Sequence, residues 1–213
     1  MNKLSLALLA LALSACLAAP RAFAQQAAAT AQPEDKTAPS YDMKAQALLD
    51  LDGVNKKVIS LAEVVPQEKF NWRPAPDARS FAEVFLHVAG ERYQIFALGD
   101  VKPPADFDGK TYEKSTTDKA KIIEQLKKTG DFTQATINAM TNADFAKLLP
   151  KLGPQANAGD VVYILVADAH EHMGQLVAYA RENAIVPPWT IAAKKAADEK
   201  AAKDKAAAEK KSP

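Results

Sequence analysis

Cysteine is almost missing from this sequence, since Cys16 is the only one among 213 residues. No disulfide bond can form within the chain, so the fold does not rest on a framework of cross-links. An excess of charge is missing as well, because 27 basic and 26 acidic side chains leave a formal net charge of +1. A nearly neutral chain gives no electrostatic reason to expect nucleic acid as a partner.

Long apolar runs are missing except at the beginning of the chain. Leu4 to Ala15 is apolar apart from Ser5 and Ser14, and it follows the basic Lys3. This stretch is shorter than the roughly 20 residues that span a bilayer. It is typical of the apolar part of a secretory signal peptide.

Two processing sites compete in this segment. Ala22-Phe23-Ala24 is the small-x-small pattern of ordinary signal peptidase, and it predicts a signal peptide over residues 1–24. Leu13-Ser14-Ala15-Cys16 is the pattern that precedes a lipidated cysteine, which would tether the protein to a membrane surface. We favour cleavage after Ala24. Both alternatives predict export to the periplasm or cell envelope.

Tails of low complexity flank the central region. Residues 25–40 are rich in Ala, Gln, Thr and Pro and predict a flexible leader. In the second tail, residues 191–213, seven lysines and four acidic residues leave a charge of +3. From Ala192 onward this tail has no large apolar residue, so we expect a solvated spacer or frayed helix. Binding of the tail to anionic lipid or envelope polymer is the alternative.

The central residues 41–190 contain four segments whose apolar side chains recur every three or four positions. This spacing predicts amphipathic helices at about 48–65, 80–99, 117–140 and 159–183. Ser80 to Glu83 has the form of a capping box, and Pro66 ends the first helix. Because no segment alternates like a strand, we predict an all-α four-helix bundle. Its long connections could carry a crossover or line the mouth of a site.

Polar side chains interrupt the apolar faces of two of these helices. Asp168 and His172 lie one turn apart on the fourth helix, offset by about 40°, so both can reach one point. On the second helix His87 lies between Val84 and Val88, and Glu91 follows one turn later. A carboxylate without a partner in a bundle core costs several kcal/mol, so these groups need partners.

A divalent metal ion would satisfy these groups together. Two imidazoles and one carboxylate, here His87, His172 and Asp168, match the ligands of zinc, nickel or iron sites with open coordination positions. Glu91 would then be a further ligand, a residue that orients a ligand, or a base. The alternative is an Asp168–His172 hydrogen bond within one helix, with His87 satisfied separately in the core.

His170 is the remaining histidine, and it lies roughly 160° from His172 around the fourth helix. We interpret it as a residue of the rim or of an interface rather than a ligand. If the ion catalyses a reaction, Glu91 and His170 are the candidates for proton transfer. The fourth helix is apolar on more than one side, which suggests packing against a second subunit in a homodimer.

Three stretches resemble the DinB-like superfamily of metal-binding four-helix bundles, and the resemblance covers residues 42–189. They are Lys69-Phe70-Asn71-Trp72-Arg73-Pro74, Phe85-Leu86-His87-Val88-Ala89, and Asp168-Ala169-His170-Glu171-His172-Met173-Gly174-Gln175-Leu176. The resemblance implies a metal held by one histidine of the second helix and an H-x-x-x-H pair of the fourth. His87 and His172 match this pattern, whereas Asp168 replaces the first histidine of the pair.

Three kinds of function fit these features. The first is an exported metal-dependent enzyme, hydrolase- or transferase-like, that acts on an unknown small molecule. The second is a non-catalytic bundle that binds a metal or small ligand and loses thermal stability on chelation. The third is an envelope interaction protein whose core polar residues only pair with each other.

Overall fold

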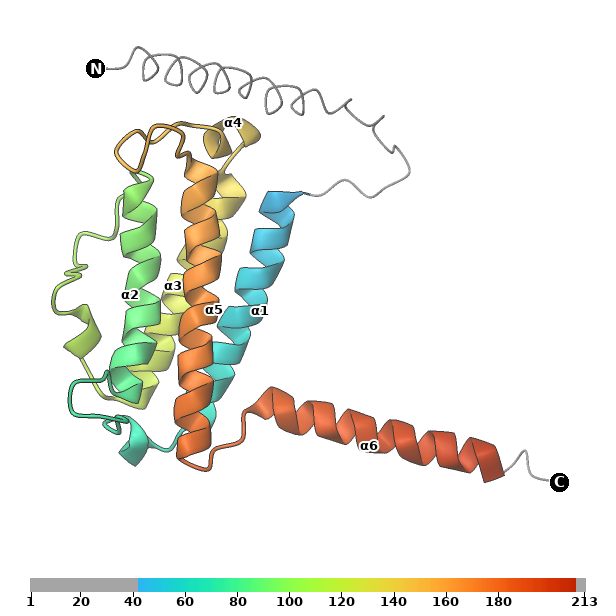
Figure 1. Cartoon of the computed structure of the whole chain (residues 1–213). Coiled ribbons are helices and arrows are strands. Elements are labelled where there is room, and N and C mark those ends of the chain that lie inside the picture. The colour runs from blue at the N-terminus through green and yellow to red at the C-terminus, as the bar shows by residue number, and fades with distance from the viewer. Residues whose placement is uncertain (1–41, 210–213) are drawn as a thin grey trace, which may run out of the picture. The chain divides into compact units, whose positions relative to one another are not determined.

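The computed structural model describes residues 42–209 of the chain (Figure 1). The predicted signal peptide at 1–24, the alternative lipid site at Cys16 and the predicted leader at 25–40 lie outside the described residues. The helices are α1 (Met43–Val64), η1 (Gln67–Lys69), α2 (Phe81–Leu98), η2 (Tyr112–Lys114), α3 (Lys119–Ala139), α4 (Asn142–Phe145), α5 (Ala158–Glu182) and α6 (Pro188–Glu209). Over these residues no strand forms, and the prediction of an all-α four-helix bundle is confirmed.

Local signals in the sequence set where the bundle helices begin and end. The Ser80 hydroxyl accepts from the Glu83 amide at 3.3 Å, and the Glu83 carboxylate accepts from the Ser80 amide at 2.7 Å. This capping box opens α2, as predicted, and Gly99 follows its last residue. Asp118 caps α3 through one hydrogen bond, which its side chain accepts from the amide of Lys121.

Each bundle helix packs against two neighbours. α1 contacts α3 and α5, and α2 contacts the same two helices, so α1 and α2 are diagonal to each other. The connections from α1 to α2 and from α3 to α5 therefore cross the ends of the bundle. The connection from α2 to α3 runs back along α2 and carries η2, which packs on that helix (Figure 1). The two end crossings and this return along α2 explain why the three connections are long.

Apolar side chains from all four bundle helices fill the interior. Val58, Phe85, Leu126 and Leu176 are each fully buried. The stripes predicted from the sequence thus face one another.

Arg92 is a buried exception in this interior. Its guanidinium donates to Leu126 O at 2.9 Å, to Thr129 Oγ1 at 3.0 Å and to Asn55 Oδ1 at 2.9 Å. Burial lowers the pKa of Arg92 to about 10. Gly130 allows the Asn55 contact, because a Cβ at position 130 would lie 2.3 Å from Asn55 Nδ2.

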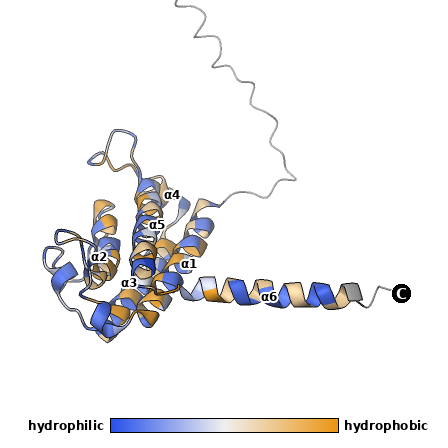
Figure 2. Ribbon diagram, turned by 60° about the horizontal axis from the view of Figure 1, so that its bottom comes forward, coloured by the Kyte–Doolittle hydropathy of each residue, from blue (hydrophilic) through white to orange (hydrophobic). Residues whose placement is uncertain are grey.

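Residues of the second tail up to Glu209 belong to α6, in which Pro188 occupies the first helical position. Side chains from Thr190 to Ala207 are exposed, and hydrophilic residues recur along the whole helix (Figure 2). A solvated helix without an apolar face is one of the forms we expected for this segment. Within residues 42–209, no helix combines the length and the apolarity that a membrane span needs.

Candidate metal site

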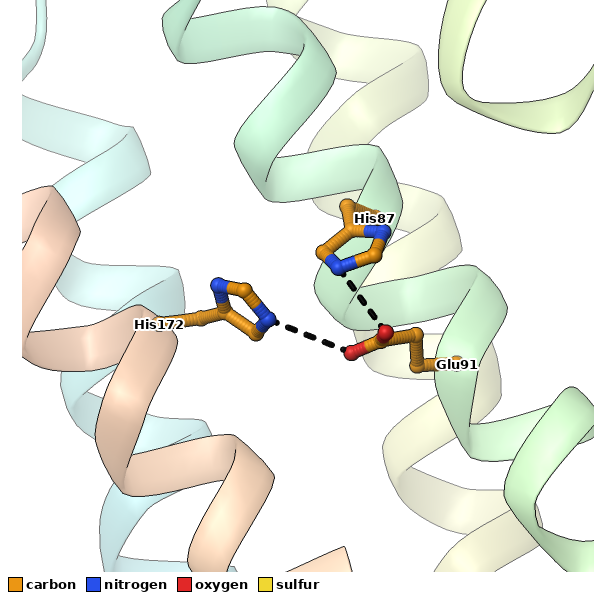
Figure 3. Close-up of side chains that lie close together, drawn as sticks. All are labelled: His87, Glu91 and His172. Atoms are coloured by element: carbon orange, nitrogen blue, oxygen red, sulfur yellow. Dashed lines mark ion pairs between the residues drawn. The ribbon is translucent and has the colours of Figure 1, made fainter. Parts of the chain in front are cut away.

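The facing surfaces of α2 and α5 bring three ligand-type side chains together. His87 and Glu91 lie one turn apart on α2, and His172 comes from α5 (Figure 3). One ligand atom from each of them lies within 4.8 Å of the other two. This spacing allows the three side chains to share one metal ion.

Both histidines direct their Nε2 atom toward the Glu91 carboxylate. His87 Nε2 is 2.8 Å from Glu91 Oε1, and His172 Nε2 is 3.3 Å from Glu91 Oε2 (Figure 3). The imidazole rings are almost perpendicular, with centroids 4.4 Å apart. His87 is 9% exposed and His172 is 8% exposed, so the cluster lies in the wall of the core.

One oxygen of this cluster has no hydrogen bond. Glu91 Oε2 is buried and finds no hydrogen-bond partner among residues 42–209, although the ring of His172 is close. A buried carboxylate oxygen without a partner is costly. A cation between Glu91 and the two Nε2 atoms would give this oxygen a partner, so the residues present fit a metal ion.

The second ring nitrogen of each histidine, Nδ1, contacts a further side chain. His87 Nδ1 is 2.5 Å from Glu113 Oε1 on η2, and His172 Nδ1 is 3.0 Å from Gln175 Oε1. Histidines that ligate metals commonly donate their other ring N–H to a carboxylate or carbonyl oxygen, which fixes the ring and its tautomer. Both Nε2 atoms are thereby directed toward Glu91.

Asp168 adjoins the three-residue cluster. Its Oδ1 is 3.4 Å from His172 Nε2, and its side chain is 20% exposed. From the sequence, Asp168 is predicted as a ligand and the role of Glu91 stays open. The structure places the Glu91 carboxylate between the two rings and Asp168 beside them.

His170 points away from this cluster. Its Nε2 is 2.8 Å from Asp50 Oδ2 on α1, and its side chain is 49% exposed. The structure therefore places His170 at the rim between α5 and α1. The proton-transfer role considered for His170 has no support from this position.

The carboxylates set the charge of the site in the metal-free protein. The carboxylates of Asp168 and Glu91 beside its ring raise the pKa of His172 to about 10. Burial raises the pKa of Glu91, but the adjacent rings of His172 and His87 outweigh it and keep that pKa well below its usual range. Burial is also the main reason that the pKa of Asp168 is raised. At neutral pH an imidazolium of His172 therefore faces an ionised Glu91.

Glu113 and Gln175 are site residues that no sequence motif identified. Glu113 lies in the long connection between α2 and α3, and the length of that connection was the only hint that it reaches a site. Gln175 follows His172 by three positions on the same helix, a spacing at which side chains are neighbours.

Comparisons with known proteins agree on the fold. A conserved protein from Enterococcus faecalis is 18% identical, with a TM-score of 0.56 over 67% of this chain and 97% of that chain. YfiT from Bacillus subtilis is 14% identical, with a TM-score of 0.55 over 72% of this chain and 95% of that chain. YfiT is described as a probable metal-dependent hydrolase with an unusual four-helix bundle topology. No curated protein matches the sequence.

A family model decides the relationship. The model of the DinB superfamily matches residues 50–176, which is more than half of the 213 residues and includes every member of the candidate site. The resemblance noted from the sequence motifs is thereby confirmed. The chain belongs to the DinB superfamily.

Proposed function

We propose that this protein is a metal-dependent enzyme of the hydrolase type, in which His87, Glu91 and His172 hold one divalent ion. The observation that carries the proposal is the buried Glu91 Oε2, which has no hydrogen-bond partner in residues 42–209 and faces two imidazole Nε2 atoms. Zinc, nickel and iron all accept two imidazoles and one carboxylate as ligands. Three protein ligands leave coordination positions open, as catalytic sites require.

Some of the residues around the ion would bind it, and another would transfer protons. A bound divalent ion supplies Lewis acidity toward an oxygen or nitrogen atom of a substrate. Glu91 offsets part of the positive charge and keeps the two rings facing one point. Asp168, half-buried beside His172, is the carboxyl group in position to accept or donate a proton at Oδ1. Burial by α2 and α5 strengthens these electrostatic interactions.

The description of YfiT as a probable metal-dependent hydrolase supports the choice of hydrolysis over transfer. We also propose that the protein acts outside the cytoplasm. The support is the apolar stretch from Leu4 to Ala15 and the Ala22-Phe23-Ala24 processing pattern.

Metal-dependent turnover tests the proposal. The protein is stripped with a chelator, reloaded separately with zinc, nickel or iron, and assayed on chromogenic esters, amides and phosphate esters. We expect hydrolysis of one substrate class that is lost on stripping, is restored by one of the ions, and is absent from His87→Ala. Hydrolysis that persists unchanged in the stripped protein and in His87→Ala would contradict the proposal. Metal binding without turnover would instead identify a non-catalytic metal-binding bundle.

The pKa of His172 predicts how metal binding depends on pH. Because this pKa is raised to about 10, the ring carries a proton at neutral pH that a metal ion must displace from Nε2. Affinity should therefore rise with pH between 7 and 10, and binding at pH 7 should release about one proton from His172. Titration calorimetry in buffers of different ionisation enthalpy counts the released protons. An affinity that stays constant across this range would show that His172 is not a ligand.

A further inference from the structure

Arg79 lies just before the capping residue of α2, and its side chain reaches the group that holds His87. Arg79 Nε is 2.9 Å from Glu113 Oε2, and a terminal guanidinium nitrogen is 3.3 Å from Glu113 Oε1. The same Glu113 Oε1 contacts His87 Nδ1. A two-point contact with a planar guanidinium fixes the carboxylate in orientation as well as in position.

The main chain of Arg79 connects to the other histidine through two side chains of α5. The Tyr179 hydroxyl donates to the carbonyl oxygen of Arg79 at 3.1 Å. The Tyr179 oxygen then accepts from Gln175 Nε2 at 3.1 Å. Gln175 Oε1 is left to contact His172 Nδ1 at 3.0 Å.

The carbonyl oxygen of Arg79 sets the donor and acceptor of each hydrogen bond between Arg79, Tyr179, Gln175 and His172. A carbonyl can only accept, so the single Tyr179 proton is used there, and Tyr179 must accept from the Gln175 amide nitrogen. Gln175 is then oriented with its oxygen toward His172, which places a proton on Nδ1 and leaves Nε2 as the ligand atom. On the other side the ionised Glu113 can only accept, so His87 also donates from Nδ1.

We propose that Arg79 is the positioning residue for both metal-binding histidines, acting on His87 through its guanidinium and on His172 through its main-chain carbonyl. This inference rests on the proposed metal site, and it assigns to one residue the tautomer and the ring orientation of two ligands. Neither chain of contacts includes a ligand atom, so Arg79 acts only through Glu113, Tyr179 and Gln175.

A residue that positions the metal ligands affects metal affinity, whereas a residue that only stabilises the fold affects the thermal midpoint. The Arg79 and Glu113 side chains are 40% and 28% exposed, and pairs at this level of exposure contribute little to folding stability. Removing the guanidinium should therefore shift the thermal midpoint by no more than about 3 °C. The metal affinity should fall by about 10-fold or more, as is typical when a partner of a ligating histidine is lost.

Single substitutions separate the two chains of contacts. Arg79→Ala removes the contact to Glu113 and keeps the carbonyl, whereas Tyr179→Phe removes one oxygen and keeps the ring packed on Trp72 and Phe81. Lys114→Gln is the matched control, because this cation neighbours Glu113 and its side chain makes no hydrogen bond or ion pair within residues 42–209. Arg79→Lys keeps the charge without the two-point contact, so it should recover only part of the loss.

Two measurements on the full chain test the inference. Zinc affinity is measured by competition with a chromogenic chelator, and the imidazole nitrogens of the metal-free protein are observed by long-range 1H–15N NMR. We expect about 10-fold weaker zinc binding in Arg79→Ala and in Tyr179→Phe, and wild-type binding in Lys114→Gln. The Nδ1 signal of His87 should move in Arg79→Ala, that of His172 in Tyr179→Phe, and neither in the control.

The two readouts keep this inference separate from the proposed function. A wild-type protein that binds no zinc, nickel or iron would overturn the metal site, while the NMR spectra would still decide whether Arg79 positions the rings. Zinc binding that is equal in all variants, with unchanged Nδ1 signals in both rings, would overturn the role of Arg79 and leave the metal site standing.

Discussion

His172→Ala is expected to weaken binding of a divalent ion by about 100-fold or more, whereas His170→Ala leaves the affinity unchanged. The two histidines lie two positions apart on α5, but only His172 directs Nε2 toward Glu91, while His170 pairs with Asp50 on α1. A four-ligand zinc site is worth roughly 10–16 kcal/mol, so one ligand corresponds to about 3 kcal/mol.

This pair of variants is compared by competition with a chelator of known affinity, with the circular dichroism spectrum of each metal-free protein as the control for folding. Because His170 is half-exposed and its ion pair lies at the surface, its loss should leave the stability nearly unchanged. Equal loss of metal in both variants would mean that the ion is bound elsewhere or that α5 must be intact as a whole.

Phe85→Ala is expected to lower the free energy of unfolding by about 3–5 kcal/mol. The Phe85 ring is fully buried and stacks on Phe70 from the connection after α1, at a centroid distance of 5.8 Å. It also stacks on Phe81 at 6.1 Å, one turn earlier on α2. Truncation removes these contacts and leaves a cavity that the surrounding helices can fill only in part.

Denaturant titration followed by circular dichroism measures this loss, with Tyr163→Ala as the matched control. Tyr163 is 70% exposed on α5, so its truncation should change the stability by less than about 0.5 kcal/mol. A Phe85→Ala protein as stable as the Tyr163→Ala protein would show that Phe85 is not packed in the core.

Apart from the start of α1, which lies at Met43 and not near residue 48, the boundaries of the bundle helices were predictable because their signals are local. Ser80 and Glu83 cap α2 through side chains three positions apart, and Gly99 ends the same helix. The apolar stripe of α1 likewise requires only the helical period and the proline after Val65. Such signals act within one or two turns of a helix, so a single sequence is sufficient to find them.

The roles of Glu91 and Asp168 depend on information that is not local. Each carboxylate lies one turn from a histidine of its own helix, Glu91 after His87 and Asp168 before His172. In the sequence the two are therefore equivalent as ligands. The rotation and height of α2 against α5 place the Glu91 carboxylate between the two rings and Asp168 beside them, and these result from the packing of the whole core.

Contacts from distant segments were also beyond sequence reasoning. Glu113 reaches His87 because the connection after α2 returns along that helix. Arg92 is buried because Asn55 of α1 and Thr129 of α3 supply its hydrogen bonds. A glutamate in a loop and an arginine in a helix are usually exposed. Residue type therefore did not predict that Glu113 contacts His87 or that Arg92 is buried.

Metal content measured by mass spectrometry tests directly whether His87 and His172 bind an ion. The protein is purified untagged and without added metal, and wild type is compared with His87→Ala and His172→Ala. We expect about one zinc, nickel or iron ion per wild-type chain and none in either variant. A wild-type protein that holds no ion, even after incubation with all three metals, and whose variants melt at the same temperature, would contradict the metal site.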